Sequence, residues 1–269
     1  MNAYRMTRLA SAALSLLAVS FVFAGQNAEC ADGYGAVTGQ FVLDGEIPEV
    51  TVLVEKGDLN VKDAAVCAKH GVLSEELVVD PKSKGIRDVF IYMRKAPKDV
   101  HPELKNSKVK EIVFDQRGCQ FKPHALFVRT DQVVVVKSDD ACAHNTHTYP
   151  IRGQAINFLL QPNNRVGVKV PNKVREILPM QVKCDIHTYM KSHWLVLDHP
   201  YAAITDKDGK FKIEGLPAGK HEFRVWHELV GYIDRKFTVT VTAGETEKKE
   251  PVKVPVAKFQ PVAAAAAGK

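Results

Sequence analysis

Apolar positions along the chain recur mostly with the spacing of β-strands. Residues 133–136 form a continuous apolar run typical of a buried strand, and residues 237–241 alternate apolar side chains with threonines, as in a half-exposed strand. Only one short helix is predicted, over residues 64–70, where Asp63 would cap the first turn. From residue 35 onward the pattern therefore predicts an all-β protein.

The order of the turn motifs predicts two interleaved β-sandwiches. Residues 35–48 resemble the opening strand of the transthyretin-like, carboxypeptidase-regulatory type of sandwich. The Asp-Gly and Gly-rich hairpin turns expected after that strand occur only much later, at residues 203–219. We therefore expect a discontinuous module built from residues 33–98 and 199–256, with a second domain inserted at residues 105–198.

The two ends of the chain have the composition of segments outside the fold. Two arginines precede a small and apolar run over residues 9–24, which is typical of a secretory signal peptide cleaved after Ala24 or Ala28. The run has about 16 residues whereas a membrane span needs about 20, so an anchor is the less favoured interpretation. We predict a signal peptide at residues 1–24, a periplasmic or secreted protein without a membrane span, and a disordered tail at residues 257–269.

Composition and charge exclude several classes of function. Of the 269 residues, 45% are hydrophobic and 25% are charged, which is typical of a soluble globular protein. The net charge is +6, and it falls to about +4 once the signal peptide with its two arginines is removed. The basic residues are spread along the chain, so a nucleic-acid partner is not expected.

The most informative segment is residues 180–190, in which a short loop follows a predicted strand. Cys184, His187 and Met190 stand three residues apart on that loop. A thiolate, an imidazole and a thioether suit copper, because Cu(I) favours sulfur and Cu(II) favours nitrogen, whereas zinc would make little use of the methionine. A second histidine must come from elsewhere, and His144 follows another predicted strand upstream.

These residues carry a resemblance to the cupredoxins. A His-Asn pair at one strand end facing a Cys-x-x-His-x-x-Met loop is similar to amicyanin. Residues 115–124, 184–187 and 198–201 also resemble bacterial proteins labelled methylamine utilisation or plastocyanin-like. The resemblance extends over most of residues 35–230 and implies a Greek-key cupredoxin β-sandwich, inserted in or packed beside the transthyretin-like one.

The resemblance also implies the cofactor and its ligands. One type-1 copper ion would be bound by His144, Cys184 and His187, with Met190 as a weak axial ligand. Asn145 would hydrogen-bond toward the ligand loop and hold it in place, as groups behind metal ligands commonly do.

Cys142 departs from the family pattern, and other histidines offer alternatives. Cys142, His144 and His147 would form a different metal site by themselves. His124, at a predicted strand start, is more often structural in such a position, and a second metal role is its alternative.

The five cysteines separate into metal and disulfide candidates. In an oxidising compartment they can form disulfides, and an odd number leaves at least one unpaired. We expect a disulfide between Cys67 and Cys119, because Cys184 is assigned to the metal and both lie just outside the presumed ligand loops. Cys119 with Cys142 is the alternative, and a retained Cys30 would allow three pairings of four cysteines.

The expected function is electron transfer, without catalysis. Copper would carry single electrons between redox partners such as a cytochrome or a dehydrogenase. Electrons would leave near His187, so Tyr189 and Ile186 are the expected docking face. The paired His-x-His motifs of multicopper oxidases are absent from the sequence, so we expect no enzyme.

Two other functions remain as alternatives. One is copper binding and delivery in the periplasm, with Cys142, His147 and His124 adding binding capacity. The other is a surface β-sandwich that binds a polysaccharide or protein and carries a vestigial copper site.

Overall fold

A computed structural model describes residues 33–259, and it is nearly all β, which confirms the predicted fold class. The predicted signal peptide, Cys30 and residues 260–269 lie outside the described residues. The helical elements are short: α1 (Ala64–Cys67), η1 (Pro102–Leu104) and η2 (Val256–Lys258). None of the described helices is both long and apolar enough to cross a membrane.

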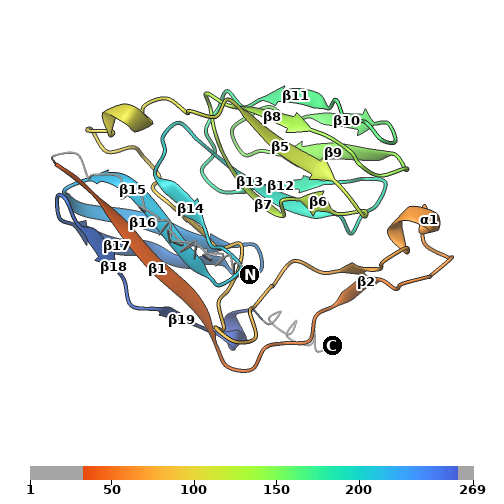
Figure 1. The fold of residues 1–269 in the computed structure, drawn as a ribbon, viewed down its shortest axis with the longest axis horizontal. Helices are drawn as coiled ribbons and strands as arrows, with labels where there is room; N and C mark the ends of the chain where they lie inside the picture. The colour runs from red at the N-terminus through yellow and green to blue at the C-terminus, as the bar shows by residue number, and fades with distance from the viewer. Residues whose placement is uncertain (1–32, 260–269) are drawn as a thin grey trace, which may run out of the picture.

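The middle of the chain forms two facing sheets, here called the middle sandwich (Figure 1). Their strand orders are β10-β9-β12-β13-β7 and β11-β8-β5-β6. The strands are β5 (Glu111–Gln116), β6 (Phe121–Lys122), β7 (Ala125–Arg129), β8 (Val133–Val136), β9 (His144–Tyr149), β10 (Asn157–Leu160), β11 (Val168–Pro171), β12 (Met180–Lys183) and β13 (Lys191–Leu197). Phe114 meets Trp194 edge-on in the core, with ring centroids 4.8 Å apart.

Strands from both ends of the described chain form two further sheets, here called the flank sandwich. The orders are β15-β1-β18, with β19 also pairing with β1, and β14-β4-β16-β17. The strands are β1 (Tyr34–Asp44), β4 (Phe90–Tyr92), β14 (Ala202–Ile204), β15 (Lys210–Pro217), β16 (Gly219–His227), β17 (Gly231–Val241), β18 (Thr246–Lys248) and β19 (Val252–Pro255). Strands that precede residue 105 in the sequence thus pair with strands that follow residue 198.

Residues 52–73, here called the arm, leave the flank sandwich and pack on the middle one. β2 (Val52–Val54) and β3 (Val72–Leu73) form a two-stranded ribbon, with α1 between them (Figure 1). Val54, Ala68 and Val72 are buried in the core of the middle sandwich. A two-stranded ribbon cannot bury its own apolar side chains, so this part of the predicted outer module contributes to the core of its neighbour.

The helix of the arm differs from the sequence prediction at both ends. It ends at Cys67 instead of continuing to His70. Asp63 has a left-handed backbone with φ 53°, and its side chain makes no capping hydrogen bond within the described chain. The physical reason is that the Asp63 carboxylate has another partner, His187 of the middle sandwich.

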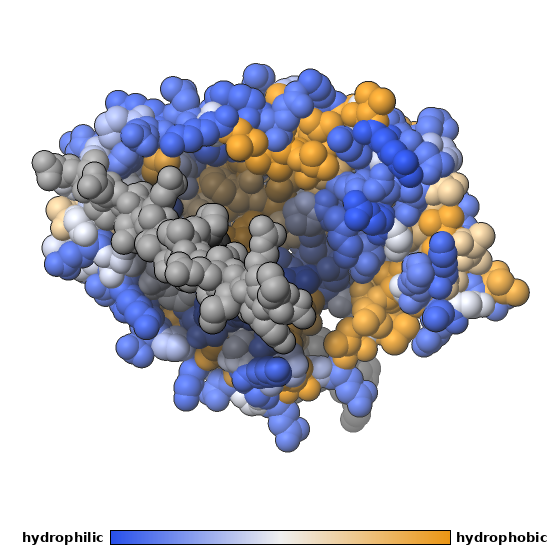
Figure 2. Space-filling model, viewed as in Figure 1, coloured by the Kyte–Doolittle hydropathy of each residue, from blue (hydrophilic) through white to orange (hydrophobic). Residues whose placement is uncertain are grey.

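A third apolar cluster joins the two sandwiches. Phe90 and Trp226 of the flank sandwich pack with Leu195 and Leu197 of β13. On the face seen in Figure 2, the molecule is hollowed where the two sandwiches and the arm meet. A cavity of about 650 Å³ lies between the arm, Lys122 and neighbouring loops.

Three residues at the predicted start of the tail, 257–259, belong to the described fold. Residues 257 and 258 belong to η2, and Phe259 is buried with the core of the flank sandwich. The ring of Phe259 lies edge-on to His227, with centroids 5.2 Å apart. Burying the apolar ring of Phe259 stabilises this segment, so the Ala- and Pro-rich composition alone does not show where the fold ends.

Candidate metal centre

Three of the predicted ligands converge in the middle sandwich. Ligand atoms of His144, Cys184 and His187 all lie within 4.8 Å of one another, and all three residues are buried. His144 Nδ1 is 3.0 Å from His187 Nδ1, and Cys184 Sγ is 4.0 Å from the same His187 atom. The topology explains the meeting, because β9 begins at His144 and pairs with β12, which ends just before Cys184.

Carboxylates hold the outer nitrogen of both imidazoles. His144 Nε2 is 2.9 Å from an oxygen of Asp140, and His187 Nε2 is 3.0 Å from an oxygen of Asp63. With the outer Nε2 turned to a carboxylate, each Nδ1 faces the other histidine and the Cys184 sulfur, where it would bind a metal ion after giving up any proton of its own. Such carboxylate–imidazole pairs fix the tautomer and orientation of histidine ligands.

Asp140 and Asp63 were missed by the sequence reasoning. Asp140 is itself held by the backbone N–H groups of Gly118 and Cys119, at 2.6 and 2.8 Å. In the sequence, only the position of Asp140 four residues before His144 pointed to this role. Asp63 was interpreted as a helix cap because its contact with the site depends on how the arm packs.

The surroundings of Cys184 favour the thiolate. Its Sγ accepts backbone N–H groups from Asn145 at 3.5 Å and His187 at 3.4 Å. Burial alone would raise the pKa of the Cys184 thiol, but hydrogen bonds from His144, His187 and these backbone groups lower the pKa to about 6. A thiol with this pKa is largely ionised at neutral pH, as a metal ligand must be.

Met190 lies on the ligand loop, and Asn145 contacts that loop from β9. Met190 is buried with Cys184 in the same apolar cluster, and its backbone N–H donates to the His187 carbonyl at 2.8 Å. The Asn145 side-chain oxygen accepts backbone N–H groups of Asp185 at 2.6 Å and Ile186 at 3.4 Å. Asn145 therefore ties β9 to the ligand loop.

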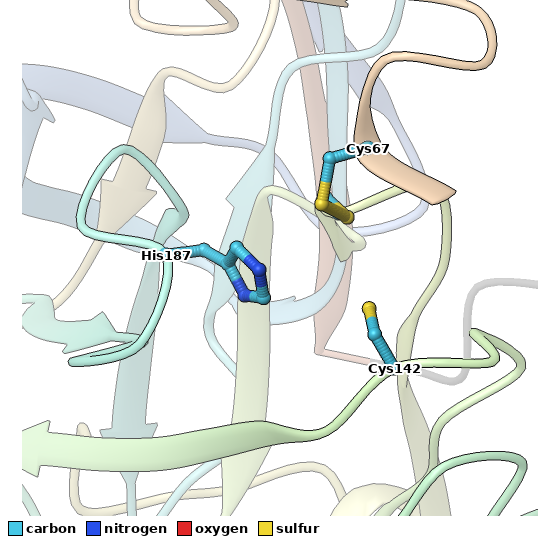
Figure 3. Close-up of side chains that lie close together, drawn as sticks. Cys67, Cys142 and His187 are labelled. Carbon is cyan, nitrogen blue, oxygen red and sulfur yellow. A yellow bond between two sulfur atoms is a disulfide. The ribbon is translucent and has the colours of Figure 1, made fainter. Parts of the chain in front are cut away.

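Cys142 lies on the outer side of the site, beside a disulfide. The structure joins Cys67 to Cys119, the pairing favoured from the sequence over Cys119 with Cys142. Cys142 forms no disulfide with any residue in 33–259. Figure 3 shows His187 and Cys142 close to this disulfide, and their ligand atoms lie within 4.8 Å of its sulfurs.

The alternative site of Cys142, His144 and His147 does not form. Cys142 Sγ is 3.5 Å from His144 Nε2, which is the nitrogen that Asp140 occupies. His147 lies three residues after His144 on β9, so its side chain points to the opposite face. There it contacts Asp185 at 3.1 Å.

The expected electron exit at His187 is covered in this structure. His187 is only 2% exposed, because the arm places Asp63 against its outer nitrogen. Tyr189 and Ile186 are half-buried and pack against the core of the middle sandwich, while the ligand loop reaches the surface at Thr188. The sequence showed that the loop must turn at the surface, but it did not show that the arm would lie over it.

Comparisons with known proteins are limited to structural neighbours. No family model and no curated protein matches the sequence. The structure is similar to a reduced amicyanin mutant (16% identity, 34% of this chain and 84% of that one, TM-score 0.29). It is also similar to the purple cupredoxin from Nitrosopumilus maritimus, with 15% identity over 32% of this chain and 98% of that one and a TM-score of 0.26. A third neighbour is the Cu-containing nitrite reductase from Thermus scotoductus SA-01, with 16% identity over 32% of this chain and a TM-score of 0.29. This chain spans only 22% of the length of that reductase.

Proposed function

We propose that the protein is an extracytoplasmic electron carrier with one type-1 copper ion. The ligands are His144 Nδ1, Cys184 Sγ and His187 Nδ1, with Met190 as the weak fourth ligand. One observation carries the proposal: two imidazole nitrogens and a thiol converge in a buried site while carboxylates occupy the outward nitrogens. Two histidines and one cysteine with a distant methionine are the donor set of blue-copper sites.

The chain's own residues keep the site rigid. When bound, copper supplies one-electron oxidation and reduction. Asp140 and Asp63 keep each imidazole in one orientation, and Asn145 keeps the ligand loop at a fixed distance from β9. The two backbone N–H groups that reach Cys184 stabilise negative charge on its sulfur. A site that moves little between oxidation states exchanges electrons with little reorganisation.

The partner is proposed to be a soluble redox protein such as a cytochrome or a dehydrogenase in the periplasm or outside the cell. It would approach the ligand loop near Ile186 and Tyr189, where the exposed Thr188 marks the surface. Because the arm covers His187, we propose that the arm forms part of the docking face.

Cys142 and Cys184 are both buried near His144, so replacing each in turn tests the copper assignment with a matched control. Cu(II) added to the wild-type protein should produce one equivalent of intense visible absorption. Cys184→Ser should abolish that colour, because its sulfur lies on the Nδ1 side, whereas Cys142→Ser should keep it. A colourless wild type, or full colour in Cys184→Ser, would refute the assignment.

Copper delivery is the second candidate, and the position of Cys142 favours it. A free buried thiol 3.5 Å from a ligand histidine offers a second soft donor for Cu(I). More than one Cu(I) per chain in wild type, reduced to one in Cys142→Ser, would support delivery over electron transfer.

A further inference from the structure

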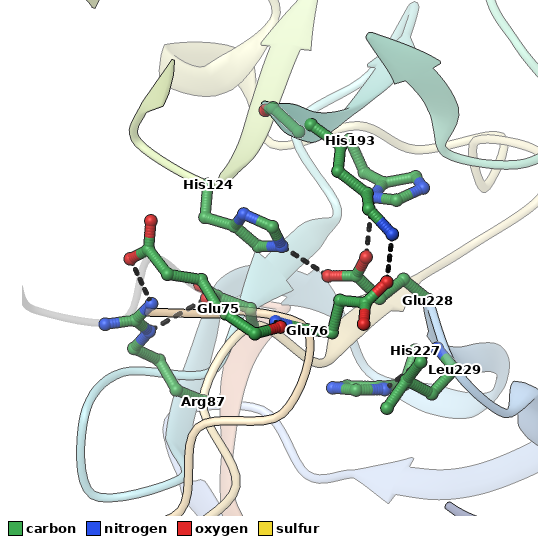
Figure 4. A network of polar contacts seen from close by, with 12 residues as sticks. Glu75, Glu76, Arg87, His124, His193, His227, Glu228 and Leu229 are labelled. Atoms are coloured by element: carbon green, nitrogen blue, oxygen red, sulfur yellow. Dashed lines mark hydrogen bonds and ion pairs between the residues drawn. The ribbon is translucent and has the colours of Figure 1, made fainter. Parts of the chain in front are cut away.

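A second cluster of possible ligands lies where the two sandwiches meet. Ligand atoms of His124, His193 and Glu228 all lie within 4.8 Å of one another. Figure 4 shows both imidazoles facing the Glu228 carboxylate, with His227 and Glu76 nearby. The copper proposal assigns no role to this group.

The fold brings these residues together from both sandwiches. His124 immediately precedes β7, and His193 lies on the adjacent parallel strand β13. The backbone N–H of His193 donates to the His124 carbonyl at 3.0 Å, so the two imidazoles start from neighbouring positions. Glu228 follows β16 of the flank sandwich and reaches across the interface.

The Glu228 carboxylate forms no ion pair with a lysine or arginine of the described residues. The Glu228 side chain is only 8% exposed. The nearby cations are already paired, since Arg87 contacts Glu75 and Lys191 contacts Glu76. A buried carboxylate without a cation is costly, so this one requires a charged imidazole or a bound metal ion.

His193 presents an unsatisfied nitrogen to the same place. Its side chain is 9% exposed, and Nδ1 has no hydrogen-bond partner among the described residues. Nδ1 lies 3.7 Å from a Glu228 oxygen, which is too long for a hydrogen bond. Burial lowers the pKa of His193 to about 4, so the imidazole is neutral and can donate a lone pair.

We propose that His124, His193 and Glu228 bind a divalent transition-metal ion that links the two sandwiches. Two imidazoles and one carboxylate form a donor set that zinc accepts with a further ligand at the fourth position. A cavity of about 250 Å³, lined by His124 and Glu76 among others, adjoins one side of the cluster. A bound metal ion would explain both the buried Glu228 charge, which it would neutralise, and the unpartnered His193 Nδ1, which it would bind.

The competing explanation is an ion pair without metal. Burial opposes a charge on His124, but the carboxylates of Glu228, Asp88 and Glu75 together raise the His124 pKa. A protonated His124 would therefore balance Glu228 but would leave the His193 nitrogen unsatisfied. The two explanations differ in whether the cluster binds a metal ion.

The test uses Zn²⁺ and a full-length chain in which Cys184→Ser disables the copper centre. One Zn²⁺ should bind and raise the unfolding temperature, because it joins two sandwiches. Adding Glu228→Gln or His193→Gln removes a direct ligand, so it should weaken Zn²⁺ binding by at least the roughly 10- to 100-fold that loss of an outer-shell partner costs, and abolish the thermal shift. His199→Gln is the matched control, because His199 is also buried with an unpartnered nitrogen but has no such neighbours.

Each outcome decides the proposal. If Zn²⁺ does not bind to the Cys184→Ser chain, or if Glu228→Gln and His199→Gln bind it equally well, the cluster is an ion pair and the proposal is overturned. Unfolding temperatures measured without metal identify any variant that fails to fold, and His124→Gln then replaces it. The copper colour of Glu228→Gln on the wild-type background reports separately on the copper site, which this proposal does not require.

Discussion

Asp63 and His187 are 124 residues apart in the sequence, yet the carboxylate of one holds the imidazole of the other at 3.0 Å. The first belongs to the arm and the second to the ligand loop. The contact leaves His187 almost fully buried. The arm is therefore part of the candidate metal centre, and its attachment should affect both metal affinity and access to the site.

Removing the carboxylate should weaken copper binding. In Asp63→Asn the side chain can no longer fix His187 as a carboxylate does, so we expect roughly a ten- to hundred-fold loss of Cu(II) affinity. Competition with a chelator of known affinity measures it. Asp58→Asn is the control, because Asp58 is also an acid of the arm, and within residues 33–259 its side chain hydrogen-bonds only with Asn60. Equal affinities in both variants would show that the Asp63 contact is incidental.

Breaking the disulfide should destabilise the protein and open the copper site. Cys67 and Cys119 close a loop with a sequence separation of 52, and the double variant Cys67→Ala, Cys119→Ala should lose about 2–4 kcal/mol of unfolding free energy. Urea denaturation measures this loss. With the arm released, electron exchange with a small inorganic oxidant should also accelerate, because Asp63 no longer covers His187. An unchanged or slower rate would show that the arm does not limit access.

Stability of the metal-free protein should fall on acidification between pH 6.5 and 4. Burial lowers the pKa values of His199 and His227 to about 4, so in this window the unfolded chain binds more protons than the folded one. Each histidine then adds a slope of up to about 1.4 kcal/mol per pH unit, with stability rising as pH rises.

Urea denaturation at pH 5 and pH 6.5 measures that slope, and His199→Gln should make it shallower. Histidines with raised pKa values, such as His124 and His144, act in the opposite direction but only above pH 6.5, as their folded forms lose the extra proton. The two windows therefore do not overlap. A slope that is identical in wild type and His199→Gln would contradict the assignment of this pH dependence to buried neutral histidines.

The sequence was most informative where the chemistry is local. Cys184, His187 and Met190 lie on one loop, so their spacing alone indicated a metal and placed them together. His144 was found because it follows a strand at the right place. The β periodicity likewise predicted the fold class, since alternation of side chains is a property of each strand by itself.

The contacts that the sequence did not predict are tertiary ones. Asp63 looked like a helix cap, because local pattern cannot reveal that the arm crosses to another sandwich. Glu228 meets His124 across an interface between segments 104 residues apart. The packing of Phe259 against the ring of His227 is likewise a tertiary contact. Such pairs depend on how sheets pack, and no periodicity encodes that.

Asn145 should be the residue whose loss most loosens the ligand loop. Its side-chain oxygen accepts the backbone N–H groups of Asp185 and Ile186, and Asn145→Ala leaves both without this partner. Losing partners of partly buried groups costs about 1–3 kcal/mol, so unfolding free energy should fall by that amount.

The neighbouring Asn157 separates this effect from a general loss of amide contacts. Asn157 contacts the Asn145 amide and the Asp185 carboxylate but accepts no backbone N–H of the loop. Because Asn157 is exposed, Asn157→Ala should cost less than about 1 kcal/mol and keep the copper colour. Asn145→Ala should also broaden or shift the visible band, since Cys184 and His187 are then less firmly placed relative to His144. Equal stability losses and identical spectra for the two variants would mean that the loop is held by its own turn, through the Met190 N–H and the His187 carbonyl, and not by Asn145.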